Sequence, residues 1–175
     1  MATRSTPPRA GQADEDHEKA TIPPHMEALR KLRILIRAAQ RHSNWIEKQC
    51  GVSGAQLWVM QELHEAPGAR VGEVAEKLAI HQTTASNLVD ALVKKGMVVK
   101  ERDPVDQRVV RLALSPDGSA LLGRAPKPAR GLMPEALHKM NDAALAELNN
   151  GLQALLDVIE LDDDNYGLQP LPFTM

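Results

Sequence analysis

Small side chains that form hydrogen bonds are concentrated between residues 82 and 87. They are Gln82, Thr83, Thr84, Ser86 and Asn87, and they stand at the start of a helical pattern. Amide and hydroxyl groups of this kind bond base edges and phosphates when a helix lies in the major groove of DNA. On an ordinary helix the same residues would form only a solvated polar face.

A second candidate group lies in a charged loop further along the chain. Arg108 stands near the tip of a predicted hairpin, where a guanidinium could enter the minor groove, whose negative potential attracts it. Asp106, two residues earlier, is placed to orient that guanidinium. The alternative is that these charges only keep an exposed hairpin soluble.

Two short amphipathic helices joined by a turn are predicted to position the polar segment. Apolar residues recur at helical spacing in both, as Val74, Ala75 and Leu78 in the first and Ala85, Leu88, Val89, Leu92 and Val93 in the second. The pattern changes phase between them, so the second helix is expected to begin near Gln82. Gly96 follows Lys94 and Lys95, which predicts a left-handed end to this helix.

The next segments are predicted to pair as a hairpin. Residues 97–100 and 109–114 are rich in β-branched side chains, and the loop between them contains Pro104 and several charges. A helix-turn-helix followed by a β-hairpin wing is therefore expected. Double-stranded DNA is the partner that this arrangement favours.

The wing sequence resembles the signature of the MarR (multiple antibiotic resistance regulator) family. The family pattern R-D-P-x-D-x-R-x-x-x-L-x-L-S/T-x-x-G is matched from Arg102 to Gly118, and the preceding LAIHQTTASNLVDALVKKG resembles the recognition helix of the same family. The resemblance covers residues 27–160 in helix order. It implies a homodimeric winged helix-turn-helix repressor of a pseudo-palindromic operator, with a small-molecule or redox input.

The resemblance also assigns roles to single residues. Arg108 matches the arginine at the wing tip that enters the minor groove, and Asp106 matches its supporting acid. Thr83, Thr84 and Ser86 match positions that face the major groove. Asn87 stands where many members carry arginine, so one contact to DNA is expected to be weaker or replaced.

Apolar stripes are predicted on helices near both ends of the chain. The first comprises Leu29, Leu32, Leu35, Ile36, Ala39, Ser43 and Ile46, and the second comprises Leu145, Leu148, Leu152, Leu155, Leu156 and Ile159, on a helix that Asn141 can cap. Together they exceed what one small domain can cover, which favours a symmetric partner. An ordinary monomer core is the alternative.

The predicted fold is mainly α with a small β-hairpin wing, a winged helix-turn-helix with N- and C-terminal dimerisation helices. The expected organisation is a flexible N-terminal tail (1–24), dimerisation helices (25–50 and 116–160), a DNA-binding lobe (51–115) and a C-terminal tail (161–175). Pro126, Pro128 and Pro134 must kink or break the helix that starts after Ser115.

A ligand site is expected between the dimerisation helices and the DNA-binding lobe, where inducers commonly bind in the family. The predicted lining residues are Arg37, Arg41, His42, Trp45, Trp58 and Met60. An arginine there could pair with a carboxylate and a tryptophan could supply a flat apolar wall, so an aromatic acid is the expected effector class. Alternatively, the tryptophans only pack in a core or interface and the arginines are solvated.

Cys50 is the only cysteine and offers a redox alternative. A peroxide sensor needs a thiol of lowered pKa, whereas Cys50 ends a predicted helix, where the dipole would raise the pKa. An incidental cysteine is therefore favoured. The six histidines show no ligand spacing with nearby acids, so neither a metal site nor a cofactor is expected.

The net charge of −2 looks unfavourable for a DNA-binding protein, but the charge is polarised along the chain. Residues 70–111 carry eight Lys and Arg against six Asp and Glu, and neither Lys nor Arg follows Lys139. The acidic C-terminal end is expected to lie away from DNA.

Other classes of protein are disfavoured. The sequence has no apolar run of membrane-spanning length and no signal-peptide pattern at its start, so a cytoplasmic location is expected. It also lacks a glycine-rich phosphate loop, a nucleophile elbow and paired carboxylates in apolar surroundings, so an enzyme is not expected. A winged-helix module that binds protein rather than DNA remains the main rival.

Overall fold

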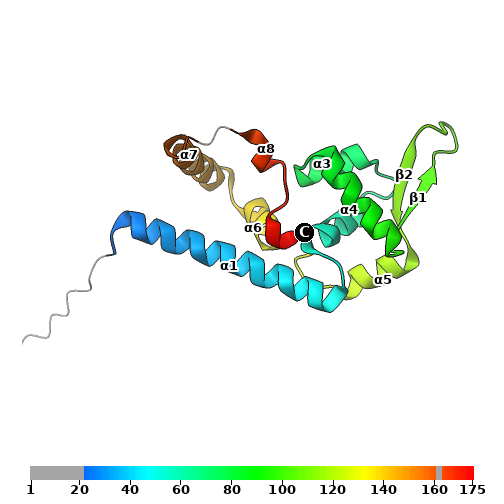
Figure 1. Cartoon of the computed structure of the whole chain (residues 1–175), viewed down its shortest axis with the longest axis horizontal. Coiled ribbons are helices and arrows are strands. Elements are labelled where there is room, and N and C mark those ends of the chain that lie inside the picture. Colours follow the sequence, from blue (N-terminus) through cyan, green and yellow to red (C-terminus); the bar gives the residue numbers. More distant parts are fainter. Residues whose placement is uncertain (1–21, 161–162) are drawn as a thin grey trace, which may run out of the picture.

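The computed structural model describes residues 22–160 and 163–175 (Figure 1). In chain order the elements are α1 (Pro24–Cys50), α2 (Gly54–Glu65), α3 (Val71–Leu78), α4 (Gln82–Lys94), β1 (Val98–Arg102), β2 (Val110–Leu114), α5 (Pro116–Arg124), α6 (Leu132–Lys139), α7 (Asp142–Val158), α8 (Asp164–Gly167) and the 3₁₀ turn η1 (Pro172–Thr174). The predicted mainly α fold with one β-hairpin is confirmed. The predicted N-terminal tail (1–24) lies almost wholly outside the described residues, whereas the described part of the predicted C-terminal tail (161–175) forms α8 and η1, and η1 packs on α1.

Helix α2 lies at the centre of a lobe built with α3, α4, α5 and the hairpin. Its side chains Leu57, Met60 and Leu63 are at most 1% exposed, and Leu92 of α4 and Leu112 of β2 pack into the same core. Burying one such side chain contributes about 1.5 to 3 kcal/mol. This core fixes the relative positions of the recognition helix and the wing.

The ends of the helices follow from local chemistry. Ser53 and Gln56 form a reciprocal capping box at the start of α2, which satisfies two backbone N–H groups. Helix α4 begins at Gln82, as the phase change predicted, and Gly96 follows it with φ +73°, a left-handed conformation that glycine adopts without strain.

The wing is an antiparallel hairpin in which Val98 lies opposite Leu114 and Arg102 lies opposite Val110. The loop before α3 extends this sheet, because Gly68 N–H donates to Leu112 O (2.8 Å) and Leu112 N–H donates to Ala69 O (3.0 Å). The hairpin projects from the end of the lobe that lies away from the start of α1 (Figure 1). It is therefore tied to the helix-turn-helix at its base and free at its tip.

Helix α5 packs inside the lobe, although the sequence analysis grouped residues 116–124 with the dimerisation helices. Leu121 and Leu122 are 3% exposed and belong to the common core. The predicted break at the prolines is confirmed, since α5 ends at Arg124 and α6 starts at Leu132 with Pro134 in its first turn. Proline is tolerated in the first turn of a helix, because the backbone N–H groups there have no partner within the helix.

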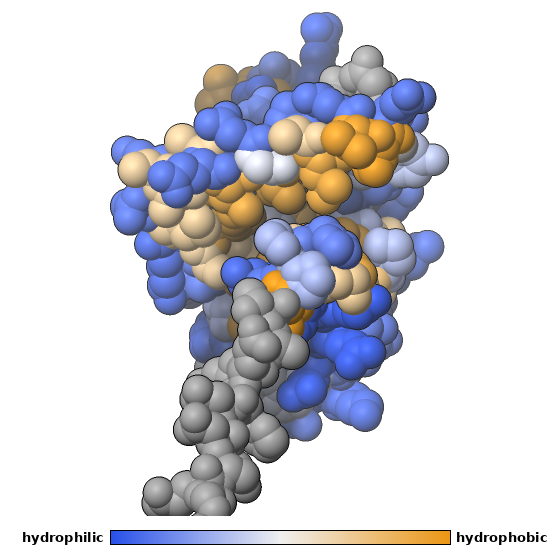
Figure 2. Space-filling view, turned by 90° about the vertical axis from the view of Figure 1, so that its left-hand side faces the viewer, coloured by the Kyte–Doolittle hydropathy of each residue, from blue (hydrophilic) through white to orange (hydrophobic). Residues whose placement is uncertain are grey.

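The two long helices leave apolar side chains uncovered. On α1, Ala39, Ser43 and Ile46 are buried against the rest of the molecule, whereas Leu29, Leu32, Leu35 and Ile36 are 36% to 53% exposed. On α7, Leu152, Leu155 and Leu156 are also exposed. Figure 2 views the molecule from the end that carries these helices and shows an apolar patch there.

Candidate nucleic-acid interface and effector cavity

The first turns of α4 present a polar face to solvent. Gln82, Thr83 and Asn87 are exposed and Ser86 is half-buried, whereas the apolar positions of the helix face the core. Thr84 differs from the expectation that it faces outward. Only 8% of it is exposed, and its Oγ1 donates to Oε1 of Gln169 at 3.3 Å, because this position lies on the side of α4 that meets the C-terminal segment.

The side chain of Arg108 is exposed at the tip of the wing. Asp106 supports the tip through the backbone, since its Oδ1 accepts from the Arg108 N–H at 3.0 Å and its carbonyl accepts from Val109 N–H at 2.9 Å. The carboxylate thus fixes the turn rather than the guanidinium itself. The guanidinium is left at the tip, where a phosphate or a groove can reach it.

Asp103 holds the base of the wing loop. It is 7% exposed, its Oδ1 accepts from the backbone N–H groups of Val105 and Asp106, and its Oδ2 lies 2.5 Å from Arg111 Nε. The two backbone hydrogen bonds and the arginine lower the pKa of this carboxyl from 3.8 to about 2. No side-chain pattern points to this role of Asp103, because the role depends on backbone N–H groups.

The recognition helix and the wing border one groove. Gln82 of α4, Arg108 of the wing and Arg70 at the start of α3 all line it, together with Val109 and Val110. The groove therefore contains two arginines and an amide, and Glu73 and Glu76 of α3 line it as well. Such a surface can bind phosphates and base edges at the same time.

A separate cavity of about 220 Å³ lies where α1, α2 and α6 meet. Of the six predicted ligand residues, His42 and Trp58 line it, with Ala39, Ile46 and Arg130 among its other walls. His42 Nε2 donates to the carbonyl of Pro128 at 3.0 Å and its ring meets the edge of Trp45, with centroids 5.9 Å apart. We refer to this space as the effector cavity.

The other predicted ligand residues lie elsewhere. Arg37, Arg41 and Trp45 border a shallow groove on another face of α1, because they point away from the lobe. Met60 is completely buried in the core of the lobe and does not line the cavity. Within one chain these four residues therefore do not line the cavity that His42 and Trp58 border.

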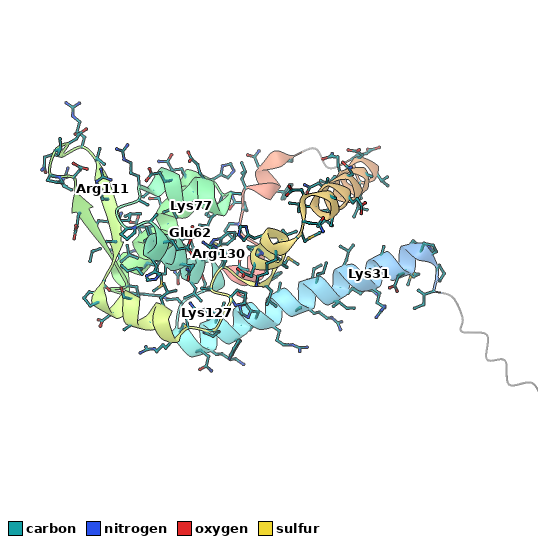
Figure 3. The ribbon with its side chains drawn as sticks, turned by 180° about the vertical axis from the view of Figure 1, so that it is seen from behind. Lys31, Glu62, Lys77, Arg111, Lys127 and Arg130 are labelled. Carbon is teal, nitrogen blue, oxygen red and sulfur yellow. The ribbon has the colours of Figure 1, made fainter. Side chains whose placement is uncertain are left out.

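Glu62 is a buried carboxylate that the sequence analysis missed. Its side chain is 6% exposed; its Oε1 accepts from Trp58 Nε1 (3.0 Å) and Arg130 Nε (2.7 Å), and its Oε2 lies 3.5 Å from Lys77 Nζ. The hydrogen bond to Glu62 raises the pKa of Arg130. Figure 3 shows Lys77 and Arg130 approaching Glu62 from two sides, so one carboxylate joins α3, α2 and the segment before α6.

Comparison with known proteins matches the same part of the molecule. The model of the MarR family matches residues 50–109. The uncharacterized HTH-type transcriptional regulator YsmB of Bacillus subtilis (strain 168) is 25% identical over 129 residues, 74% of this chain and 86% of YsmB. The HTH-type transcriptional repressor MdtR of the same organism is 24% identical over 118 residues, 67% of this chain and 76% of MdtR. Residues 50–109, which span α2 to the wing, thus match the MarR family.

Solved structures of MarR-type regulators share the fold. A MepR-like protein complexed with pseudoligands is 19% identical with a TM-score of 0.54, over 78% of this chain and 97% of the other. The PcaV transcriptional regulator from Streptomyces coelicolor, in complex with its natural ligand, is 23% identical with a TM-score of 0.53, over 79% of this chain and 97% of PcaV. The predicted winged helix fold is confirmed.

The matched family and both relatives are transcriptional regulators rather than enzymes, and this similarity indicates a DNA-binding transcriptional regulator. In the part of the chain that the structure describes, no helix is long and apolar enough to cross a membrane. Within the same residues, no three His, Cys, Asp or Glu side chains are grouped as metal ligands.

Cys50 is half-buried at the end of α1. Burial raises the pKa of its thiol, an effect that Arg124 opposes only in part. A raised pKa lowers the fraction of reactive thiolate at neutral pH. The raised pKa of the Cys50 thiol therefore disfavours the redox alternative.

Proposed function

We propose that the protein is a homodimeric repressor that binds a pseudo-palindromic operator. The observation that carries this proposal is the groove shared by Gln82 and Arg108, in which the polar start of α4 lies beside the guanidinium of a projecting hairpin. A recognition helix in the major groove and a wing arginine in the adjacent minor groove require this arrangement. The relative MdtR is named a repressor, which supports repression rather than activation.

In this proposal the partner is a second copy of the chain. The exposed leucines of α1 and α7 form the apolar surface that such a partner would cover. A twofold dimer presents two recognition helices, so the operator half-sites should lie about 10 base pairs apart, one turn of DNA.

Binding to DNA can be tested with duplexes selected from a random pool. Replacing Arg108 with alanine should weaken binding to the selected duplex. It should also reduce the slope of log K against log salt by about one unit, because one cationic contact to DNA is lost. Val105→Ala is the matched control, since Val105 lies in the same loop, is 94% exposed and carries no charge. Equal affinities of the Arg108→Ala variant and the wild type would refute the wing assignment.

We further propose that a small, mainly apolar molecule in the effector cavity releases the operator. The cavity is large enough for a single ring, since an engineered apolar cavity of about 150 Å³ holds benzene. His42 and Trp58 supply aromatic rings to the wall of the cavity, and Arg130 supplies a positive charge. An aromatic carboxylate fits this lining if it replaces Glu65 as an ion-pair partner of Arg130. Glu65 is the more exposed of the two acidic residues that pair with Arg130.

The ligand site can be tested by calorimetry with benzoate and cinnamate. Filling the cavity with Ala39→Leu should abolish binding, because Ala39 is a buried wall residue of α1. Arg41→Ala should leave binding unchanged, since Arg41 borders a different groove. Binding that survives Ala39→Leu but is lost in Arg41→Ala would place the site on the outer face of α1 instead, and no binding by the wild type would exclude these two acids.

A further inference from the structure

The C-terminal segment of the chain forms one side of the effector cavity. After α8 it returns between α1 and the lobe, so that the C-terminus lies near the centre of the molecule, next to α6 (Figure 1). Gln169, Pro170, Leu171, Phe173 and Thr174 all line the cavity, opposite residues of α1 and α2. None of these residues belongs to the core of the lobe.

The start of this segment is hydrogen-bonded to the start of the recognition helix. The N–H of His81, which precedes α4, donates to the carbonyl of Leu168 at 3.0 Å, and Thr84 Oγ1 donates to Gln169 Oε1 at 3.3 Å. The far end of the segment, η1, packs on α1, and Thr174 lies next to Gly54 at the start of α2. One short peptide therefore joins the recognition helix α4 to α1 through the cavity wall.

The C-terminal segment carries apolar and conformationally restricted residues that suit binding in an apolar cavity. Phe173, the only phenylalanine in the chain, is half-buried there. Pro170 and Pro172 flank Leu171, and proline restricts the backbone, so little conformational entropy is lost when the peptide docks. An aromatic ring is also what His42 and Trp58 are suited to contact.

We propose that the C-terminal peptide, anchored by Phe173, is a displaceable wall of the effector cavity, and that apolar molecules too large for the space of about 220 Å³ enter by displacing this peptide. Displacement would break the bonds to His81 and Thr84 and free the recognition helix from α1. A ligand can shift the protein only through such a difference between two states. The link to operator release rests on the proposed function, whereas docking of the peptide does not.

Fluorine NMR tests the docking directly. Because Phe173 is the only phenylalanine, incorporation of 4-fluorophenylalanine gives a single resonance. In the full chain this resonance should be broad and displaced from that of the free labelled peptide 164–175. A sharp resonance at the position of the free peptide would overturn the proposal.

Displacement is tested with the fluorescent probe 8-anilinonaphthalene-1-sulfonate. A chain that ends at Gly167 should bind the probe about tenfold more tightly than the full chain, as expected if the segment is docked in about nine of ten molecules. Peptide 164–175 added in trans should displace the probe, whereas the same peptide with Phe173→Ala should not. Equal displacement by both peptides, or equal probe affinity of both chains, would overturn the proposal.

Full-length variants show whether a change in probe binding comes from the loss of Phe173 or from unfolding caused by the truncation. Phe173→Ala should raise the affinity for the probe as the truncation does, whereas Tyr166→Ala should not, since Tyr166 is 70% exposed on α8 and does not line the cavity. Increased probe binding by both variants would indicate general loosening and count against the proposal. None of these measurements uses DNA, so their failure would leave the proposed repressor function intact.

Discussion

Two adjacent threonines at the start of α4 have different surroundings. Thr83 is exposed on the face that carries Gln82 and Asn87, whereas Thr84 is buried and bonded to Gln169. A single step along a helix turns a side chain by about 100°, so neighbours on one helix can serve DNA recognition and internal packing.

Thr83→Ala should change the preferred DNA sequence, because an exposed hydroxyl on this face can bond a base edge. Thr84→Ala should leave the preference unchanged and lower stability by about 1 kcal/mol, the usual value for one hydrogen bond. Selection of duplexes from a random pool and urea unfolding measure the two effects. Uniform loss of binding to all duplexes on Thr83→Ala would make this residue a phosphate contact.

Asp103 makes the wing sensitive to acid. Its carboxyl has a pKa of about 2 in the folded protein and an ordinary value of 3.8, so the folded state favours the charged form. This contribution to stability is complete above about pH 4 and is lost as the pH falls towards 2.

Asp103→Asn should therefore destabilise the protein at pH 7, because the bond to Arg111 loses its charge. The difference in unfolding free energy between variant and wild type should shrink as the pH falls from 4 to 2. Urea unfolding at a series of pH values measures it. A difference that stays constant over this range would show that the charge of Asp103 is not what holds the loop.

At the scale of the elements, α5 depends on one close backbone approach. A Cβ at Gly118 would lie 2.1 Å from the carbonyl oxygen of Met97, and the same oxygen accepts from Ser115 N–H at 3.0 Å. Ser115 also caps α5, since its Oγ accepts from Gly118 N–H and donates to Gly96 O. The family pattern S/T-x-x-G thus describes how α5 docks on the end of the recognition helix.

Gly118→Ala should lower stability by about 1 to 3 kcal/mol, the usual cost of overpacking, because the obstacle is backbone and cannot rotate away. Gly123→Ala on the same helix has no atom within 4 Å of its new Cβ and should be neutral or stabilise by up to about 1 kcal/mol. Urea unfolding compares the two. Similar stabilities of both variants would contradict the close packing of α5.

At the scale of the whole molecule, the apolar surface and the charge are both polarised. Helix α7 lies at the end of the molecule away from the wing (Figure 1), and the exposed leucines of α1 and α7 lie at that end too. The acidic residues after α7 were expected to lie away from DNA, but the chain returns from α8 to the start of α4. That these acidic residues lie away from a bound duplex stays a prediction.

Leu152→Glu combined with Leu156→Glu should convert the proposed dimer into a monomer, because both leucines are about 40% exposed on α7 and two charges there would have to be buried. Sedimentation measures the mass, and operator affinity should fall with it since the two lobes are no longer linked. Val105→Glu on the wing is the control and should not change the mass. A double variant that remains a dimer would exclude α7 from the interface.

The sequence by itself determined the order of the main elements and which polar side chains the start of α4 and the wing carry. Apolar spacing and a left-handed glycine are local signals, so the limits of α4 and the approximate limits of the wing could be predicted from neighbours in the chain. The exposed positions of Gln82 and Arg108 followed from the same patterns, and the family signature covered this region.

Only the tertiary structure decided which distant residues share a site. Arg41 and His42 are adjacent in sequence yet border different spaces, because α1 packs on the lobe with one face only. Glu62 meets Arg130 across 68 residues, and Thr84 meets Gln169 across 85, through contacts that depend on how helices dock. Helical periodicity states which residues share a face but not what covers that face. For this reason only His42 and Trp58 of the predicted residues line the effector cavity, and its C-terminal wall could not be predicted from the sequence.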